Sequence, residues 1–479
     1  MPLILGAQSA AAATGVVTNS CRFDDGDAVQ LHRAVSVEGN RKVWTISFWF
    51  KKGNAVGCRL FAQGNTPSQD PSTMFELGAS GAMTIFDYRS STYNFILEPL
   101  ARLKDPDAWY HLCLSFDSTP STPSSSSIKF FINGTQQTAF GTETYPSQDF
   151  ETEINNTTYD FYVGAYDGGN YYDGYMAEFC LIDGTAYDAD SFGQFNADSP
   201  TVWEPIDVSE LTFGTNGFYL DFEDSSALGT DAAGSNNLTA TNLAAVDQCV
   251  DTPVNNFCTI NPLDSYYQSS TYSEGNCKVV TESGSAVYAF NTGTMGVTAG
   301  KWYWEVKYTN STAGGAFFYG VAAELATSTS TELGQTAQQI GFLNNNTTRT
   351  NNTATAFGDT GGFTTGDIMG CALDMTNSRI FFAKNGVWMT PAATSGGDPT
   401  DGTGNVALPT AVASTKIGAY LPAFGPYVNA SQTYEVNFGN PSYTNTSDAA
   451  DGNGYGKFEY APPTGFLALC TKNLGSDGG

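Results

Sequence analysis

The chain has 479 residues, and 41% of them are hydrophobic, enough apolar material for more than one buried core. Its 48 acidic and 20 basic side chains give a formal net charge of -28, which repels a phosphate backbone, so we expect no nucleic-acid partner. The 51 Gly, 32 Phe and 25 Tyr, with only 14% charged residues, favour strands and turns over helices and predict an all-β protein.

The first residues, 1–19, are small and mildly apolar and show no strand pattern. They lack a positively charged start, and their hydrophobic run is too short for a signal peptide or a membrane span. No later segment approaches the roughly 20 uninterrupted apolar residues of a membrane helix. We therefore expect an N-terminal arm that becomes ordered against a neighbouring chain, and no membrane insertion.

The nine cysteines are an odd number and most lie singly in apolar strand patterns, with no Cys-x-x-Cys pair. This usage is typical of buried free thiols in a protein that folds in a reducing cytosol. With His32 and His111 as the only histidines, a zinc site has few ligands available.

The first half of the chain contains runs in which apolar and polar residues alternate, as in antiparallel strands with one buried face. In "GFYLDFED" (217–224) the apolar positions point inward, whereas Tyr219, Asp221 and Glu223 point outward. Turns rich in Gly, Asn, Asp and Ser separate such runs, which predicts a β-sandwich. The other runs are "VWTISFWFKK" (43–52), "YHLCLSFD" (110–117), "FYVGAY" (161–166) and "YMAEFCLIDG" (175–184).

Two stretches, "SIKFFINGTQ" (127–136) and "SRIFFAKNGVW" (378–388), share the pattern Ile-x-Phe-x-x-Asn-Gly. Asn-Gly tolerates the two positive φ angles of a type I′ turn, so each stretch predicts a strand that enters a tight hairpin. Elsewhere the two halves differ too much for a simple repeat. The similarity therefore indicates two separate sandwiches that use the same kind of hairpin.

The second half continues with further strand patterns, and a segment low in charge and rich in Asn, Thr and Ala precedes it. By composition this segment, residues 227–267, is a linker. The strand patterns are "GKWYWEVKY" (300–308), "FFYGVAA" (317–323), "GDIMGCALDMTNSRIFFAKNGVW" (366–388) and "YEVNFG" (434–439).

These motifs carry two family resemblances. The first half, through "WTISFWFKK", "AWYHLCLSFD", "IKFFINGTQ" and "GYMAEFCLIDGTAY", resembles the concanavalin A-like, laminin G or pentraxin type of lectin domain. The second half resembles a SPRY domain. The resemblances imply two tandem antiparallel β-sandwiches of jelly-roll type. The expected divisions are an arm at 1–19, a lectin-like domain at 20–226, a linker at 227–267, a SPRY-like domain at 268–470 and a tail at 471–479.

The passage from the first half into the second, and the ending "YAPPTGFLALCTKNL", resemble surface proteins of tailed bacteriophages, usually described as tail fibre or structural proteins. This resemblance implies a protein of the virion surface that is assembled in the host cytoplasm. Its expected partners are other virion proteins and a host-surface glycan or protein, and its expected assembly is a homotrimer.

Two alternatives stay open. No collagen-like, heptad or β-helix repeat supplies a fibre shaft, so a capsid decoration or head fibre with a structural role competes with a tail fibre. A eukaryotic-type adhesion protein is the third interpretation, because several Asn-x-Ser/Thr sequons occur. They include Asn133, Asn237, Asn310 and Asn429.

Carboxylates offer the only candidates for catalysis. Some concanavalin A-like proteins cleave glycans with two strand-borne carboxylates, for which Glu178, Asp221 and Glu223 are available. The usual Glu-x-Asp-x-Glu spacing is absent, and outward carboxylates on a strand are ordinarily solvated. We therefore predict that the protein is not an enzyme.

Two acidic stretches could bind calcium, although no cofactor is required by the sequence. "DDGD" (24–27) and "YDGGNYYDG" (166–174) offer carboxylate and carbonyl oxygens, the ligands that calcium prefers. The alternative, which we favour, is that these Asp-Gly pairs only form turns.

Three loops are predicted to bind a ligand. A strand at 338–343 leads into a long Asn/Thr-rich loop with one cation, the stretch 421–430 places aromatic residues between prolines, and the tyrosine-rich loop 166–174 is the third. Amides and hydroxyls suit sugar hydroxyl groups, and aromatic rings stack on sugar rings. The alternative is that the first loop is merely solvated and that Phe424 is a core residue. The candidate residues are Asn344, Asn345, Arg349, Phe424, Tyr427, Tyr166, Asp167, Tyr171 and Tyr172.

Overall fold

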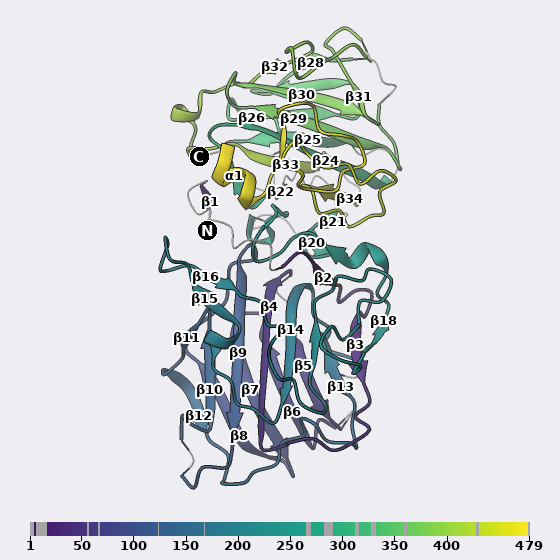
Figure 1. Cartoon of the computed structure of the whole chain (residues 1–479). Coiled ribbons are helices and arrows are strands. Elements are labelled where there is room, and N and C mark those ends of the chain that lie inside the picture. The colour runs from purple at the N-terminus through teal and green to yellow at the C-terminus, as the bar shows by residue number, and fades with distance from the viewer. Residues whose placement is uncertain are drawn as a thin grey trace. The chain divides into compact units, whose positions relative to one another are not determined.

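The computed structural model describes most of the chain. The described residues are 4–5, 17–54, 57–65, 68–122, 124–166, 168–264, 270–281, 291–311, 316–326, 332–358, 362–393, 395–427 and 431–477. Strands dominate them and α1 (Thr471–Asp477) is the only α-helix in this part of the chain, which confirms the all-β prediction (Figure 1). No helix within these ranges is long and apolar enough to cross a bilayer.

Internal contacts place the described residues from Val17 to Val254 in one unit, and Ile4–Leu5 together with the residues from Asn255 onward in the other. We call the first of these units the N-terminal sandwich and the second the C-terminal sandwich. The prediction of two tandem β-sandwiches is confirmed, because each unit consists of two sheets that enclose a core of its own.

The N-terminal sandwich is built from two antiparallel sheets. Sheet 1 has the order β11-β10-β9-β4-β14-β2-β19, with β17 also paired to β14, and sheet 2 has the order β12-β8-β7-β6-β5-β13-β3-β18. Sheet 1 comprises β2 (Ser20–Phe23), β4 (Val43–Lys52), β9 (Trp109–Asp117), β10 (Ile128–Ile132), β11 (Thr135–Gln136), β14 (Gly174–Asp183), β17 (Phe218–Leu220) and β19 (Gln248–Cys249). Sheet 2 comprises β3 (Gln30–Arg33), β5 (Cys58–Gly64), β6 (Ser72–Leu77), β7 (Met83–Arg89), β8 (Thr92–Pro99), β12 (Phe140–Thr144), β13 (Phe161–Val163) and β18 (Thr239–Thr241).

The core between these sheets follows from the alternation in the sequence. Ile46, Phe48 and Phe50 of β4 face Phe61 and Phe75 of sheet 2, and all five side chains are buried. Burying aromatic and aliphatic side chains in this way supplies most of the stability of such a sandwich. The apolar positions of the run 217–224 also point into this core, as predicted.

The outer face of sheet 1 is covered by the chain that follows β14. Cys180 and Ile182 of β14 point outward and pack against Phe192 and Val208 of the covering segment. This segment contains η1 (Ala189–Ser191) and a small hairpin of β15 (Gly193–Phe195) and β16 (Trp203–Pro205). The face that alternation alone leaves to water is therefore partly a second apolar layer.

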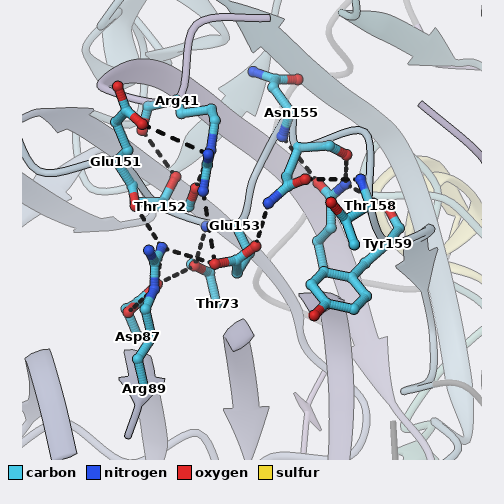
Figure 2. A network of polar contacts seen from close by, with 12 residues as sticks. Arg41, Thr73, Asp87, Arg89, Glu151, Thr152, Glu153, Asn155, Thr158 and Tyr159 are labelled. Atoms are coloured by element: carbon cyan, nitrogen blue, oxygen red, sulfur yellow. Dashed lines mark hydrogen bonds and ion pairs between the residues drawn. The ribbon is translucent and has the colours of Figure 1, made fainter. Parts of the chain in front are cut away.

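A polar network joins β6 and β7 of the same unit to the segments that precede β4 and β13 (Figure 2). Arg89 pairs with Asp87 at 3.0 Å and with Glu153 at 3.0 Å, and Arg41 approaches Glu153 at 3.6 Å. The Thr73 hydroxyl donates to Asp87 at 2.6 Å and accepts from the backbone N–H of Glu153 at 2.8 Å. Asp87 and Glu153 are buried, so the two arginines supply the charge compensation that their burial requires.

The C-terminal sandwich also has two main sheets. One has the order β20-β21-β34-β24-β29-β30-β31, with β32 on β30 and β35 on β24, and the other has the order β22-β33-β25-β26-β27-β28. The first comprises β20 (Ser270–Ser273), β21 (Lys278–Thr281), β24 (Lys301–Ser311), β29 (Ile368–Asp374), β30 (Arg379–Lys384), β31 (Val387–Trp388), β32 (Val406–Ala407), β34 (Gln432–Asn437) and β35 (Leu467–Ala468). The second comprises β22 (Asn291–Thr292), β25 (Ala316–Ala322), β26 (Gln339–Leu343), β27 (Thr347–Thr350), β28 (Thr353–Ala356) and β33 (Leu421–Tyr427).

Short elements complete this unit. A two-residue strand, β1 (Ile4–Leu5), pairs in parallel with β23 (Met295–Gly296), so two residues of the predicted arm lie in a strand, while most of the arm lies outside the described residues. Trp302, Trp304 and Tyr319 are buried in the core. The other short helices among the described residues are η2 (Ala245–Asp247), η3 (Pro262–Asp264) and η4 (Val412–Ser414).

Residues 227–254, which composition suggested as linker, carry structure of the N-terminal sandwich. β18 pairs with β3, and β19 pairs with β2, so this segment adds an edge strand to each sheet. β18 is exposed or half-buried along its length, whereas Cys249 of β19 is buried. All nine cysteines are buried thiols that form no disulfide bond, as predicted.

Candidate ligand-binding site

A pocket of about 460 Å³ opens on the outer face of sheet 1, between the turn after β10 and the hairpin β15–β16. Residues of this hairpin, of η1 and of the β10 end line it. The lining residues are Phe131, Gly134, Asp188, Ala189, Asp190, Gly193, Gln194, Phe195, Trp203 and Ile206. We call it the Trp203 pocket.

The hairpin places two aromatic rings side by side. Phe195 pairs with Trp203 across β15 and β16, and the ring centroids lie 4.9 Å apart in a T-shaped arrangement. The side chain of Asn196 holds the connecting turn, because its Oδ1 accepts from the backbone N–H of Asp198 and of Ser199, each at 2.9 Å. Such Asx turns fix a loop without hydrophobic burial.

Two glycines make room for the indole ring. A Cβ atom at Gly134 would lie 2.3 Å from ring carbons of Trp203, and one at Gly193 would lie 2.5 Å away. Gly134 also has a φ of +73°, in the left-handed region that favours glycine. The Asn-Gly turn that the sequence predicted as a hairpin is therefore also one wall of this pocket.

The rim of the pocket is polar. Asp188 is paired with Lys129 at 2.7 Å, whereas Asp190 is exposed and has no ion pair in the described structure. Gln194 donates to Glu204 at 3.1 Å. The ring of Phe195 is 46% exposed, which is unusual for a large apolar side chain in this protein. An exposed aromatic ring beside a carboxylate and an amide can stack on a sugar ring and bind its hydroxyl groups.

The sequence interpretation did not select this pocket. Phe195 and Trp203 lie in "QFNADSPTVWEP" (194–205), where two aromatic residues flank a turn with the sequence Asn-Ala-Asp-Ser-Pro. That pattern could have indicated an aromatic pair at the ends of a hairpin. Its contact with Gly134 was not visible, because the two segments are far apart in the chain.

The polar residues of the C-terminal sandwich that were predicted to bind a ligand differ in exposure and in their contacts. Arg349 lies in β27, and its guanidinium is bound by the side chains of Glu332 and Asn352 and lies over the Phe318 ring. Its charge is therefore already neutralised. Asn345 is exposed and accepts a hydrogen bond from the Thr347 hydroxyl at 2.6 Å, and Asn344 is half-buried.

Phe424 of β33, which was predicted to be an aromatic platform for a sugar, does not lie at the surface. This ring is completely buried and packs against Tyr434 and Phe438, with centroids 6.1 Å apart in both cases. A side chain in the core cannot stack on a sugar ring, so the core alternative holds for this residue. The Tyr427 side chain lies outside the described residues.

The tyrosine-rich loop of the N-terminal sandwich is likewise mostly internal. Tyr172 is buried and donates its hydroxyl to the Lys51 carbonyl at 2.6 Å. Tyr166 is also buried, Tyr171 is half-buried, and Asp167 lies outside the described residues. Burial corrects the expectation that Tyr166 and Tyr172 are available to a ligand, because strand pairing draws the loop ends inward.

The two acidic stretches proposed for calcium meet in space. Carboxylate oxygens of Asp24, Asp25 and Asp173 lie within 4.8 Å of one another. Asn54 donates to Asp25 at 3.2 Å and to Asp173 at 3.1 Å, and burial raises the pKa of Asp25. The donor set suits a hard cation such as calcium, and a flip of the Asn54 amide would add a fourth oxygen. Calcium binding here stays a prediction.

Comparison with known proteins agrees with the two domain types. Residues 23–189 match the family described as the concanavalin A-like lectin/glucanases superfamily, and residues 301–441 match the SPRY domain. Both predicted resemblances, and their order, are confirmed. No curated protein matches the chain.

Solved structures with similar parts include three examples. The SPRY domain of human HERC1 has 17% identity, covers 37% of this chain and 96% of its own, and gives a TM-score of 0.27. A heptameric SAP-like pentraxin from Limulus polyphemus has 12% identity over 36% and 80%, with a TM-score of 0.28. A Bacteroides ovatus protein, provisionally described as carbohydrate-binding, has 13% identity over 47% and 58%, with a TM-score of 0.33.

Proposed function

We propose that the chain is a non-enzymatic surface protein of a tailed-phage virion, and that its N-terminal sandwich binds a host-surface glycan in the Trp203 pocket. The observation that carries the binding role is the pocket itself, in which Phe195 and Trp203 stand beside Asp190 and Gln194. The virion setting is supported by the sequence resemblance, and the lectin-like and SPRY domains suit a binding protein.

The chemistry of the pocket fits a sugar. One face of a pyranose is lined by C–H groups that pack on an aromatic ring, while its hydroxyl groups need donors and acceptors at the edge. Phe195 supplies the exposed ring, and Asp190 and Gln194 supply polar atoms at the rim. A volume of about 460 Å³ lies in the usual range for small-ligand pockets, about 300–1,000 Å³.

The same pocket is poorly equipped for hydrolysis. Glycoside cleavage normally requires two carboxyl groups in different roles, one as acid and one as base or nucleophile. Of the two aspartates in the pocket, Asp188 is held by Lys129, with both carboxylate oxygens accepting from the ammonium group at 2.7 and 2.9 Å. Binding without cleavage is therefore the function that this geometry favours.

The test is binding of host cells and of a glycan array by the full chain and two alanine variants. Phe195→Ala should lower affinity at least tenfold, because the exposed ring is lost. Tyr93→Ala is the matched control: Tyr93 is 48% exposed and lies T-shaped on Phe86 at 5.4 Å, as Phe195 lies on Trp203. Equal affinity of Phe195→Ala and the parent, or an equal loss in both variants, would refute the role of this pocket.

Placement of the protein in a virion separates the two structural settings. Density at the tail tip would support an attachment protein, whereas ordered copies on the capsid lattice would support the alternative of a decoration protein. The proposed homotrimer predicts a particle three times the 51.0 kDa chain mass, and monomers at micromolar concentration would contradict it.

A further inference from the structure

A second pocket, of about 550 Å³, lies beside β17 in the N-terminal sandwich. It contains three carboxylates, one aromatic ring and two methyl groups. Its lining residues are Asp207, Ser209, Tyr219, Asp221, Glu223, Ala232 and Ala233. We call it the acidic pocket. Tyr219, Asp221 and Glu223 are the residues that alternation placed on the outer side of this strand.

The negative charges in the acidic pocket are not balanced by cations. Within the described ranges, Asp207, Asp221 and Glu223 form no ion pair with Lys, Arg or His. Their hydrogen bonds come from neutral donors only. Asp221 accepts from the Glu223 backbone N–H at 3.0 Å, Asp207 accepts from the Ser209 N–H at 2.9 Å, and Glu223 accepts from the Thr18 hydroxyl at 3.0 Å.

A fourth carboxyl group stands behind this surface. Glu178 of β14 is only 6% exposed, and one oxygen accepts from the Tyr219 hydroxyl at 2.6 Å. Its other oxygen has no hydrogen-bond partner among the described residues. The register of β14 shifts between Ala177 and Cys180, where Glu178 has a φ of +53°, and the Glu178 side chain contacts Tyr219, which lines the pocket. Burial, and then the nearby charges of Asp221, Glu223 and Asp207, raise its pKa to about 8.

The spacing of these groups decides which cation fits. Groups of three acidic side chains close enough to hold one metal ion occur in the described structure, and Asp207, Asp221 and Glu223 do not form one. Charges spread around a pocket suit an elongated cation with a positive group at each end. The Tyr219 ring and the methyl groups of Ala232 and Ala233 offer a surface for an aliphatic stem and a cation–π contact.

We propose that the acidic pocket binds a small aliphatic diamine or polyamine, with its ammonium groups at Asp207, Asp221 and Glu223 and its methylene stem along Tyr219. This site is independent of the Trp203 pocket and of the glycan that it is proposed to bind. Glu178 acts as a positioning residue, because it holds the hydroxyl of Tyr219 and adds negative charge when it ionises.

Hydrolysis is the competing use of these carboxylates. It would need Glu178 to reach a glycosidic oxygen as the general acid. Glu178 does not line the pocket, it is only 6% exposed, and one of its two oxygens is bound by the Tyr219 hydroxyl. A cation bound at Tyr219 needs only the carboxylates and the ring that line the pocket, so Glu178 can stay buried.

The test is calorimetric titration of the full chain with putrescine at physiological ionic strength. One saturable site per chain is expected, and Glu223→Gln or Asp221→Asn should weaken it at least tenfold. Both residues are exposed or half-buried, so unchanged unfolding temperatures should accompany the loss. Glu143→Gln, which removes the same charge from an exposed position in β12, is the matched control and should bind as the parent does.

Three results would overturn the proposal. One is the absence of saturable binding. Another is equal weakening by Glu143→Gln and Glu223→Gln, since this would mean that the net charge of -28 attracts the amine without a site. The last is complete displacement by an equal concentration of magnesium chloride, which would assign the pocket to metal ions. In the parent, affinity should rise between pH 7 and 9 as Glu178 ionises, and Glu178→Gln should abolish that rise.

Discussion

The two Asn-Gly turns have the same local structure and different surroundings. In the N-terminal sandwich, Asn133 donates its N–H to the His111 carbonyl at 2.9 Å, and its side chain accepts from the His111 N–H at 2.8 Å. In the C-terminal sandwich, Asn385 makes the same two bonds with Ile368, at 2.8 and 2.9 Å. Both Asn residues, and the Gly residues after them, have positive φ angles, as the sequence pattern predicted.

An aromatic ring from a distant segment lies on the glycine of each turn. Trp203 covers Gly134 and lines the Trp203 pocket, whereas Tyr460 covers Gly386. The backbone N–H of Tyr460 is bound by the buried carboxylate of Glu305 at 2.8 Å. The same turn therefore supports a ligand pocket in one unit and a fixed chain segment in the other, because the covering segment differs.

The largest expected effect comes from filling the space under either ring. Gly134→Ala and Gly386→Ala each place a Cβ at positive φ, 2.3 Å from Trp203 and 2.5 Å from Tyr460 respectively. We expect each to destabilise its own sandwich by about 2–4 kcal/mol. Hydrogen exchange by mass spectrometry resolves the two units, and only Gly134→Ala should also weaken glycan binding. A loss of protection in both units from one substitution would contradict this comparison.

One substitution at two buried carboxyls should have opposite effects. Glu305 accepts backbone N–H groups on both oxygens, from Tyr460 and from Glu459 at 3.0 Å, so a glutamine must turn its NH₂ toward one of them. Glu305→Gln should therefore destabilise the C-terminal sandwich by about 1–3 kcal/mol. Glu178 accepts its hydrogen bond from the Tyr219 hydroxyl and from no backbone N–H group of the described structure. Glu178→Gln should therefore stabilise the N-terminal sandwich at pH 9. Denaturant titration of both variants at pH 9 measures the change in the free energy of unfolding relative to the parent. A change of the same sign in both variants would refute the prediction.

Stability should also depend on pH through Glu178. Its folded pKa of about 8 lies above the ordinary value of 4.5, so the folded state binds this proton more tightly than the unfolded state. The resulting stabilisation is present below about pH 4.5 and is lost as the pH rises through 8. The denaturation midpoint of the N-terminal sandwich should decrease as the pH is raised from 6 to 9. In Glu178→Gln this midpoint should depend less on pH. A parent midpoint independent of pH would contradict the assignment.

The smallest expected effect concerns the turn asparagines. Asn133→Ala and Asn385→Ala each remove a side-chain hydrogen bond to a backbone N–H, and each should cost about 1–2 kcal/mol. Asn385→Ala also removes the bond that its amide donates to Asp367 at 2.8 Å, but this bond is exposed to water and adds little. The two losses should therefore agree to within about 0.5 kcal/mol. A clearly larger loss for Asn133 would show that the pocket wall adds strain to the first turn.

Prediction from sequence succeeded where the information was local. Alternation in the run 217–224 gave the outward positions of Tyr219, Asp221 and Glu223, and the Asn-Gly pairs gave both hairpins. It was less successful for aromatic residues in loops and edge strands. Phe424, Tyr166 and Tyr172 look like exposed platforms beside Pro, Gly and Asp, but sheet pairing and packing bury all three.

By itself, the sequence determined the all-β class, the two sandwiches and their order, the free buried thiols and the two tight turns. These depend on strand periodicity and turn chemistry, which act over a few neighbouring residues. Only the tertiary structure decided that Trp203 meets Gly134, that Asp25 meets Asp173, and that the carboxylates beside β17 share one pocket. Those contacts join segments distant in the chain, and their geometry is set by sheet order and by the segment that covers sheet 1.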